Sequence, residues 1–278
     1  MIWYNTGMKQ NLHTHTIYCD GSDTPAEMLE AAMAKGFDSL GFSGHAPAPF
    51  DAAAMHRENY AAYLSEIRHL QEQHSGRFPV YLGIEEDLDA RVEHPEQFDY
   101  IIGSVHFLPL GNELKSIDYT REQFIALLEN TCGGSMPAMA AAYYEKVSRL
   151  AACSEVDIAG HIDLIAKFNE HEDFFRFDDP VYLSYACQAV DCLAPAKIIE
   201  VNTGAMARGY RSRPYPDIHL LQYMYEKKAK LCLCSDCHDR SFLDYGFAEA
   251  LQLIRRCGFR SLMILTPDGF REEDIDRF

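Results

Sequence analysis

Short apolar runs alternate with longer amphipathic segments along the chain. A short run that is rich in Val, Ile and Leu and is bounded by polar or turn residues is typical of a buried strand. The first run carries two histidines two positions apart, and a period of two places both rings on one face of a strand. We expect strands at residues 9–15, 38–42, 78–84, 99–105, 156–160, 197–201, 230–234 and 261–265.

The segments between these runs have the apolar spacing of amphipathic helices. The first helix has clear start signals, because Thr24 is a good N-cap, Pro25 suits the first helical position and Glu27 completes a capping box. Gly36 is a good stop signal for it. Residues 169–179 form an acidic, aromatic loop without periodicity. We expect helices at about 25–36, 57–74, 121–130, 136–153, 180–193, 218–228 and 246–256.

The alternation of strands and helices predicts the architecture. It is typical of βαβ units and of a mostly parallel sheet. About seven such units in a chain of 278 residues favour closure into an α/β barrel. No internal repeat, linker or low-complexity tract divides the sequence, so we expect one domain over residues 1–278. In such barrels the reactive side chains lie at the C-terminal ends of the strands, which makes the residues after each strand the functional candidates.

Composition and charge narrow the classes of function. The formal net charge of −17 argues against nucleic acid as the main partner, because phosphate backbones bind to basic surfaces. No apolar run reaches the roughly 18 residues of a membrane span, and residues 1–7 lack the basic and apolar regions of a signal peptide. Nine scattered cysteines favour reduced thiols over a disulfide framework. We expect a cytoplasmic protein that binds neither nucleic acid nor membranes, with its oligomeric state left open.

Potential metal ligands follow six of the predicted strands. His13 and His15 end the first strand, and Asp20 lies in the loop after it. Imidazole and carboxylate groups that converge at strand ends suit a divalent metal ion. A single histidine at such a place usually has a structural role, but six of the twelve histidines lie at these positions. The other candidate ligands are His45, Glu85, His106, His161, Asp236 and His238.

In sequence order, these residues resemble the motifs of the PHP family of metal-dependent phosphoesterases. The stretches Ser-Val-His, Gly-His-Ile-Asp and Glu-Val-Asn-Thr-Gly look most similar to the histidinol-phosphatase branch of that family. Each motif is weak alone, but together they are specific and cover nearly the whole chain. The matching stretches are His13-Thr-His15-Thr with Asp20, Ser-Gly-His45-Ala-Pro, Gly-Ile-Glu85, Gly-Ser-Val-His106, Gly-His161-Ile-Asp and Ser-Asp236-Cys-His238.

The resemblance implies a fold and a metal cluster. The family has a distorted (β/α)7 barrel, similar to a TIM barrel, that holds three divalent metal ions. Nitrogen and oxygen ligands without thiolate suit zinc, manganese or iron, and the residues do not decide among these metals. Carried over residue by residue, the resemblance places one ion on His13, His15, Glu85 and Asp236, a second on Glu85, His106 and His161, and a third on Asp20, His45 and His238.

The resemblance also implies a reaction, the hydrolysis of L-histidinol phosphate to L-histidinol and phosphate in histidine biosynthesis. Clustered divalent ions neutralise the phosphate dianion and lower the pKa of a bridging water, which supplies hydroxide near neutral pH. Asp236 and His238 are the candidates for protonating the leaving alkoxide, although metal binding alone would account for both. The alternatives are a phosphoesterase for nucleotide or sugar phosphates, a PHP-type regulatory module without turnover, and a metal-dependent amide hydrolase. The complete ligand set argues against the regulatory module.

Candidate contacts to the substrate are fewer. Arginine is the natural partner of phosphate oxygens. Arg208 is the first candidate, because it follows the sixth strand, which lacks a metal ligand; Arg211 and Arg213 are weaker candidates. The imidazole and ammonium groups of histidinol phosphate call for carboxylates and aromatic rings. Asp118 and the loop at residues 169–179 offer such groups.

Two other patterns have ordinary explanations. Cys232, Cys234 and Cys237 have part of the spacing of a zinc knuckle, but no second cysteine pair follows at knuckle spacing. Buried free thiols explain the first two better, because they alternate with leucines in an apolar strand. Glu86 and Asp87 flank one candidate ligand, and the sequence leaves open whether they support the ligands or face solvent.

Overall fold

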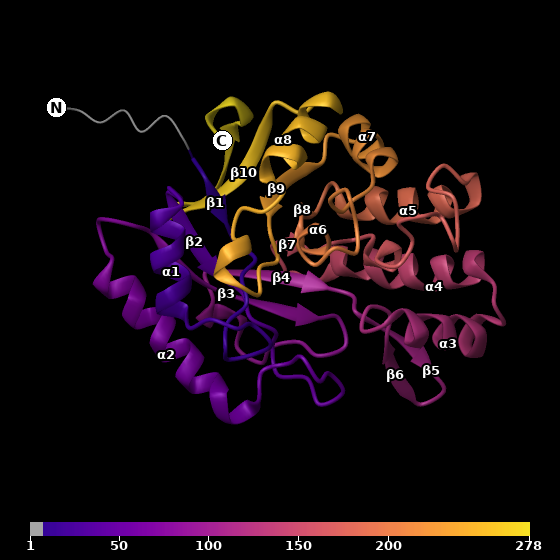
Figure 1. The fold of residues 1–278 in the computed structure, drawn as a ribbon, viewed down its shortest axis with the longest axis horizontal. Helices are drawn as coiled ribbons and strands as arrows, with labels where there is room; N and C mark the ends of the chain where they lie inside the picture. Colours follow the sequence, from indigo (N-terminus) through magenta and orange to yellow (C-terminus); the bar gives the residue numbers. More distant parts are fainter. Residues whose placement is uncertain (1–7) are drawn as a thin grey trace.

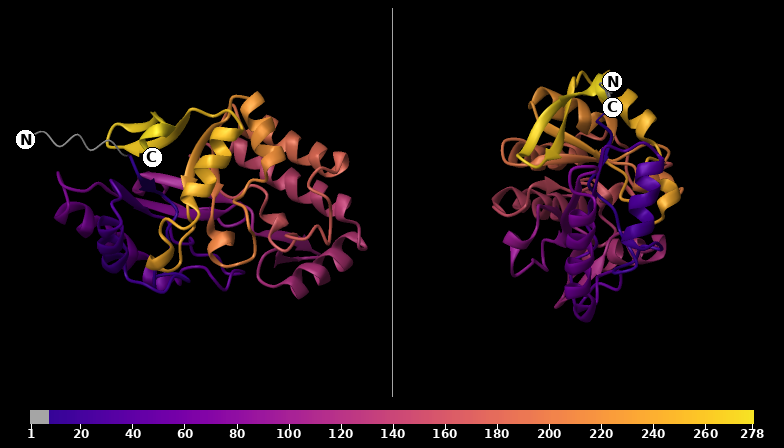
Figure 2. Two further views of the ribbon diagram at one scale, coloured as in Figure 1. Left: turned by 45° about the horizontal axis from the view of Figure 1, so that its top comes forward. Right: turned by 90° about the vertical axis from the view of Figure 1, so that its left-hand side faces the viewer.

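The computed structural model describes residues 8–278 and contains a seven-stranded parallel sheet that curves into a barrel (Figures 1 and 2). All neighbouring strands of this sheet pair in parallel, as the alternation of elements predicts. The absence of a signal peptide was predicted from residues 1–7, which lie outside the described part. In sheet order the strands are β1 (Gln10–Asn11), β2 (Ser39–Phe42), β3 (Val80–Asp87), β4 (Tyr100–Ser104), β7 (Ile158–Ala159), β8 (Ile198–Asn202) and β9 (Lys230–Cys234).

The helices lie on the outer side of the strands (Figures 1 and 2). The capping box predicted for the first helix is present, since the Thr24 hydroxyl accepts a hydrogen bond from Glu27 N and the Glu27 carboxylate accepts one from Thr24 N. Within residues 8–278, no helix is both long and apolar enough to span a membrane. The helices are α1 (Pro25–Ala34), α2 (Arg57–Gln73), α3 (Arg121–Cys132), α4 (Met136–Arg149), α5 (Pro180–Leu193), α6 (Gly204–Ala207), α7 (Ile218–Glu226) and α8 (Phe247–Arg256).

Two hairpins depart from the predicted pattern. Strands β5 (Phe107–Leu110) and β6 (Glu113–Ser116) form an antiparallel hairpin over a turn in which Gly111 has a φ of +62°, a conformation that favours glycine. The predicted terminal strand is β10 (Ser261–Thr266), which pairs with β11 (Gly269–Asp274) rather than with the barrel. Both hairpins were missed because the prediction searched for βαβ units. The short helix α6 was missed as well.

The barrel closes where the chain continues beyond its two edge strands, β1 and β9. Thr14 and Cys237 form an isolated parallel bridge. His15 N donates a hydrogen bond to Cys237 O at 2.8 Å, and Cys237 N donates one to His13 O at 3.1 Å. The first strand, predicted at residues 9–15, is therefore shorter, since β1 covers only Gln10–Asn11. Beyond it, Thr14 O still accepts from Ser43 N after β2 at 3.0 Å, while the backbone crosses to Cys237, which follows β9. This crossing carries the two histidines onto the end of the barrel.

Asn11 secures this closure with its side chain, which is completely buried. Its amide nitrogen donates to Ser235 Oγ at 2.6 Å and to Leu243 O at 3.3 Å. Its amide oxygen accepts from Ser235 N and from His13 N, each at 3.1 Å. Because buried polar groups need partners, this single amide fixes the backbone on both sides of the closure.

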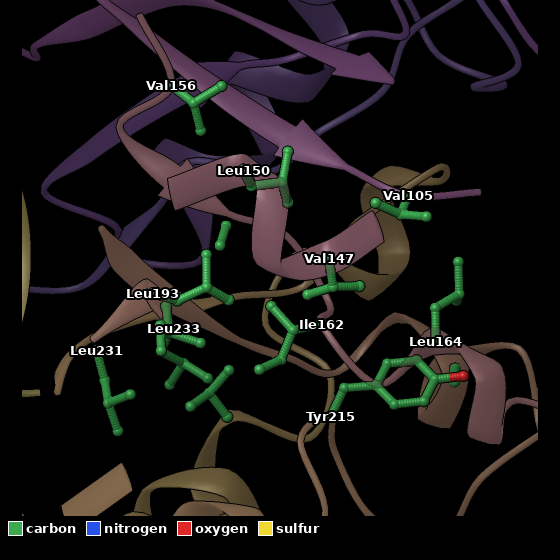
Figure 3. Packing of buried hydrophobic residues seen from close by; sticks show 14 of the residues in the cluster. Val105, Val147, Leu150, Val156, Ile162, Leu164, Leu193, Tyr215, Leu231 and Leu233 are labelled. Atoms are coloured by element: carbon green, nitrogen blue, oxygen red, sulfur yellow. The ribbon is translucent and has the colours of Figure 1, made fainter. Parts of the chain in front are cut away.

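The main hydrophobic core lies between the barrel and the helices (Figure 3). Figure 3 shows Val147 of α4, Leu193 of α5 and Leu233 of β9 in this layer, and all three are buried. Burial of one such side chain stabilises the fold by about 1.5–3 kcal/mol relative to exposure. Packing from both sides explains why the strands read as continuous apolar runs.

A second, smaller cluster fills the barrel interior below the histidines. Tyr100 is buried within this cluster, and its hydroxyl donates a hydrogen bond to Leu12 O. A Cβ added to Gly83 would lie 2.3 Å from the Tyr100 ring, so glycine is needed at that strand position. Cys232 and Cys234 belong to this apolar floor as buried free thiols, which confirms the structural explanation of their spacing.

Candidate metal centre

All nine candidate ligands lie at the end of the barrel where the parallel strands terminate. Seven of them line a cavity of about 220 Å³, together with Arg208, Lys167, Asp118, Tyr119 and Asp51. His13 and His15 lie fully buried. The seven ligands that line the cavity are Asp20, His45, Glu85, His106, His161, Asp236 and His238.

Glu85 is the centre of the cluster, and its side chain is 1% exposed. Its Oε2 lies 3.1 Å from His13 Nε2 and 3.1 Å from His45 Nδ1. Its Oε1 lies 3.0 Å from His161 Nε2 and 3.4 Å from His106 Nε2. One carboxylate thus faces imidazoles from four different segments, the arrangement expected of a ligand shared by two metal ions. The prediction placed Glu85 just after its strand; it lies within β3, which continues to Asp87.

Asp236, next to Glu85, is a second carboxylate that faces several basic side chains. Its Oδ1 lies 3.2 Å from His15 Nε2 and 3.7 Å from His13 Nε2. Its Oδ2 lies 2.9 Å from Nη2 of Arg208, so this carboxylate joins the histidines to the cation that lines the cavity. A Cβ at Gly204 would lie 2.8 Å from Asp236 Oδ2 and 2.9 Å from Arg208 Nη2. Glycine at that position therefore makes room for the ion pair.

Asp20 is a third carboxylate of the cluster, and its side chain is partly exposed to solvent. Its carboxylate oxygens lie 3.1 Å from His238 Nε2, 3.4 Å from His15 Nδ1 and 3.9 Å from His45 Nε2. Across the cluster, the ligand atoms that lie within 4.8 Å of one another form four overlapping groups. The overlap follows the three implied ligand sets in part, but His13, His15, His45 and Glu85 each belong to two groups. The groups are His15-Asp20-His45-His238, His13-Glu85-His161, His13-His15-Asp236 and His45-Glu85-His106.

The donor atoms fit metal ions better than they fit one another. Several buried side-chain atoms here have no hydrogen-bond partner in the described structure, which is costly in a protein interior. Imidazole nitrogens and carboxylate oxygens at such spacing are ligands for zinc and similar divalent ions. The unpartnered atoms that face the cluster are His13 Nε2, His15 Nε2 and Glu85 Oε2; the Nδ1 atoms of His106 and His161, in rings whose Nε2 faces Glu85, also lack a hydrogen bond.

The charges of the cluster point to the same conclusion. Burial alone would lower the pKa of His106, but the carboxylates of Glu85 and Asp87 raise it to about 10. Burial likewise opposes the charge on His13, yet Glu200, Glu85 and Asp236 raise its pKa well above the usual value. Burial would raise the pKa of Glu85, but His13, His45 and His106 hold it well below the usual range. Without metal, protons on His13 and His106 would supply part of the balancing positive charge, whereas burial lowers the pKa of His45.

The backbone of two ligands is strained. His161 has a φ of +20° and Asp236 a φ of +49°, a region that residues other than glycine rarely adopt. Such residues tend to lie at functional sites, where surrounding contacts hold them. For His161 that contact is a hydrogen bond from its backbone N to Glu200 Oε2 at 2.8 Å.

Two further carboxylates contact the histidine rings at the nitrogen that faces away from Glu85. Glu200 Oε1 lies 2.6 Å from His13 Nδ1, and Glu200 Oε2 also accepts from the Asn202 side chain at 3.0 Å. Asp87 Oδ2 accepts from His106 N at 2.8 Å and lies 3.4 Å from Nδ1 of the same ring. Carboxylates in these positions orient metal-binding imidazoles and increase their basicity. Asp87 is thus a buried support, which answers the question that the sequence left open.

Sequence reasoning missed Glu200, although a signal was present. It lies inside the apolar strand β8, two residues before Asn202, so both side chains point to the same face. A carboxylate in a buried strand is expensive unless it is paired, and the nearest available partners are histidines. Glu86 has a different environment, since its carboxylate accepts from Val92 N at 2.8 Å and lies 3.5 Å from Arg91 Nε.

Of the predicted substrate contacts, Arg208 and Asp118 line the cavity. Arg211 is buried and has a structural role, because its Nη1 donates to Ala166 O at 2.9 Å and its guanidinium covers the Phe177 ring at 4.5 Å. Lys167 is a cavity cation that the sequence analysis did not select; its Nζ lies 3.1 Å from Asp118 Oδ2.

The acidic, aromatic loop at residues 169–179 does not line the cavity. Phe174 packs edge-to-face on Phe124, with ring centroids 4.9 Å apart, and Phe175 stacks on Tyr182 at 4.1 Å. The loop's acidic side chains are used within the fold as well: Glu170 lies 3.4 Å from Arg211, Asp173 lies 2.9 Å from Arg121, and Glu172 accepts from Phe177 N at 3.1 Å. Arg213 is exposed and lies away from the cavity.

Comparison with known proteins relates the chain to one family. The family model described as "PHP domain" matches residues 11–204. A protein of Deinococcus radiodurans named "Probable histidinol-phosphatase" is 31% identical over 90% of this chain and 94% of its own length. The "Histidinol-phosphatase" of Bacillus subtilis is 27% identical over 88% of this chain and 98% of its own length.

Solved structures confirm the fold. The crystal structure of histidinol phosphate phosphatase from Lactococcus lactis, in complex with zinc, L-histidinol and phosphate, has a TM-score of 0.71. It is 19% identical in sequence, and the match covers 95% of this chain and 98% of that one. A structure from Listeria monocytogenes has a TM-score of 0.76 and 20% identity, with 87% of this chain and 99% of the other covered. The predicted barrel architecture is therefore confirmed.

Glu200 is expected to contribute to metal affinity because it holds the His13 ring. Changing Glu200 to Gln places an amide N–H₂ group among three N–H donors, so the His13 ring loses its fixed orientation. We expect metal affinity to fall about 10- to 100-fold, as for other carboxylates that support a metal-binding histidine. Calorimetric titration of metal-free protein measures this directly. Glu86→Gln, which removes a buried carboxylate without contact to the ligands, is the matched control; equal affinity in wild type and Glu200→Gln would contradict the role.

Metal affinity of the cluster is expected to depend on pH. The raised pKa values of His13 and His106 mean that metal binding must displace protons from imidazoles near neutral pH. We expect apparent metal affinity to rise as the pH increases from 6 to 8, with protons released on binding. Titration calorimetry in two buffers of different ionisation enthalpy measures the number released. Binding that releases no protons at pH 7 would show that these imidazoles are already neutral.

Proposed function

The chain belongs to the PHP domain family, and from this premise we propose that it is a metal-dependent phosphatase that hydrolyses L-histidinol phosphate to L-histidinol and phosphate. The observation that carries the proposal is the convergence of nine nitrogen- and oxygen-bearing side chains at one end of the barrel, seven of them lining one cavity, with buried donor atoms left unpartnered. The 31% and 27% identity to proteins named histidinol-phosphatase, over about nine-tenths of the chain, supports this choice of substrate.

The cluster suits three divalent ions, and we propose zinc, manganese or iron. We propose that His13, His15 and Asp236 would hold one ion and His106 and His161 a second, with Glu85 contributing to both. Asp20, His45 and His238 would hold the third. Ions bound here would neutralise the phosphate dianion and supply hydroxide near neutral pH.

The chain's own side chains complete the site. Arg208 is the proposed phosphate partner, because its guanidinium lines the cavity and is held by Asp236 at 2.9 Å and by Asp236 O at 3.2 Å. Lys167 adds a second positive charge on the cavity wall. Burial opposes ionisation of Asp236, but Arg208 and His13 hold its pKa well below the usual range, which favours a ligand role over a proton-donor role. His238, the other candidate for proton transfer, is placed on the third ion as well, and burial lowers its pKa, so a ligand role accounts for both residues.

The other proposals follow from this role. We propose a single domain that acts in the cytoplasm on a small molecule, without nucleic acid as a partner. The charge of −17 supports the last point. Hydrolysis of a nucleotide or sugar phosphate remains the alternative activity within the same family. Since no predicted ligand position is vacant, a regulatory module without turnover fits less well.

The proposal is tested by phosphate release from L-histidinol phosphate, a nucleoside monophosphate and a sugar phosphate, with metal content determined on the same sample. We expect a strong preference for L-histidinol phosphate that a chelator abolishes and that added zinc or manganese restores. A metal-loaded sample that does not hydrolyse L-histidinol phosphate would retain the metal cluster but reject this substrate.

Arg208 provides a sharper test of the phosphate site. Changing Arg208 to Ala removes a charge-assisted partner of the phosphate, so we expect KM to rise about tenfold or more while metal content stays near wild type. The exposed Arg213 gives a matched control, and Arg213→Ala should leave KM unchanged. An unchanged KM in Arg208→Ala would remove this residue from the phosphate site.

A further inference from the structure

Beyond the candidate metal ligands, the cavity is lined by aromatic side chains. The His106 ring lies edge-on to Phe107, with centroids 6.4 Å apart, and Phe107 lies edge-on to Tyr119 at 6.1 Å. The Tyr119 hydroxyl in turn donates a hydrogen bond to the carboxylate of Asp51. This series of contacts leads from a metal ligand to a carboxylate on the same cavity lining, with an aromatic surface between them.

Asp51 differs from the other carboxylates of the cavity. Five carboxylates line it, and in the described structure four of them face a basic side chain. Asp20 and Glu85 face histidines, Asp236 faces Arg208, and Asp118 faces Lys167. No cationic side chain within residues 8–278 forms an ion pair with Asp51; its carboxylate accepts hydrogen bonds from the Tyr119 hydroxyl and from Ala53 N, the latter at 2.8 Å. Its negative charge is therefore available to a ligand.

Asp118, the carboxylate that the sequence suggested for this purpose, is already engaged. Its Oδ1 accepts a hydrogen bond from Ser116 Oγ at 2.8 Å, and its Oδ2 faces Lys167 Nζ at 3.1 Å. Although burial alone would raise the pKa of Asp118, Lys167 lowers it to about 2. A cationic ligand would have to displace that ammonium group, so Asp118 serves better as the support of Lys167.

We propose that Asp51 is the residue that selects substrates with a cationic organic group, by pairing with a positively charged nitrogen of the leaving alcohol. The inference rests on the proposed phosphatase function and names the determinant of its substrate preference. With the phosphate at the metal end and Arg208, the alcohol extends along Phe107 and Tyr119 toward Asp51. Aromatic rings beside a carboxylate are a favourable environment for an ammonium or imidazolium group.

The local structure prepares Asp51 for this role. The Tyr119 hydroxyl also accepts a hydrogen bond from Ala52 N at 2.9 Å, so one side chain ties the loop after β2 to the loop after β6. Phe107 is held further by Phe50, whose ring lies edge-on at 4.9 Å. Since these contacts fix the carboxylate before substrate arrives, binding need not order the loop.

The test compares Asp51→Asn with wild type on two esters, L-histidinol phosphate and glycerol phosphate, whose alcohol is uncharged. Asparagine keeps the oxygen that accepts from Tyr119 and Ala53 while it removes the charge. We expect the ratio of kcat/KM for L-histidinol phosphate to that for glycerol phosphate to fall about tenfold, with metal content unchanged. Glu113→Gln removes an exposed carboxylate from the β5–β6 hairpin and should keep the wild-type ratio.

The other outcomes are equally informative. An unchanged ratio in Asp51→Asn, including an equal loss on both esters, would overturn the inference while leaving the phosphatase function intact. Tyr119→Phe removes the loop tie but keeps the charge, and we expect a smaller fall in the ratio. A fall as large as that of Asp51→Asn would attribute selectivity to loop order instead of charge. A metal-loaded wild type that is inactive on L-histidinol phosphate would overturn the proposed function and, with it, this inference.

Discussion

The burial of Glu85 among imidazoles from four segments of the chain is the interaction on which the rest of the structure depends. An isolated carboxylate in a protein interior is very unfavourable, and it becomes tolerable only when positive charge surrounds it. Here His13, His45, His106 and His161 approach its two oxygens from four segments of the chain. Protons on the imidazoles can supply the charge, but divalent ions satisfy the same lone pairs on both partners. The cluster is therefore an arrangement that metal binding completes.

The strand arrangement of the barrel makes the burial of Glu85 possible. Parallel strands bring their C-terminal ends to one edge, and the crossing at His13–Cys237 draws the first and last strands together there. Asn11 holds that crossing with a fully buried amide. Below it, Tyr100 and the apolar floor exclude solvent. Around the ligands, Glu200 orients the His13 ring and Asp87 orients the His106 ring. The barrel closure, the apolar floor and the supporting carboxylates all keep water away from the ligands. Exclusion of water strengthens the interactions between the charged groups of the cluster.

The sequence predicted the barrel, most helix limits and the identity of the nine clustered side chains, because these depend on local periodicity and on the rule that reactive groups follow parallel strands. The β5–β6 hairpin was not predicted, because it lies in a connection between a strand and a helix that normally contains no further strands. Arg211 was placed with the substrate because it follows Arg208 closely, but a short helix and turn direct it into the fold, onto Phe177. Asp51 and Lys167 lie in loops, where only tertiary structure shows which side chains reach the cavity.

Location of the ions tests the central claim most directly. Crystals grown with zinc or manganese, and diffraction recorded on both sides of the metal's absorption edge, would place the anomalous scatterers independently of any catalytic assay. The account predicts three peaks among the nine side chains, with one pair of ions joined by Glu85. Fully occupied crystals with peaks only elsewhere on the protein, or with a single ion that does not touch Glu85, would contradict it.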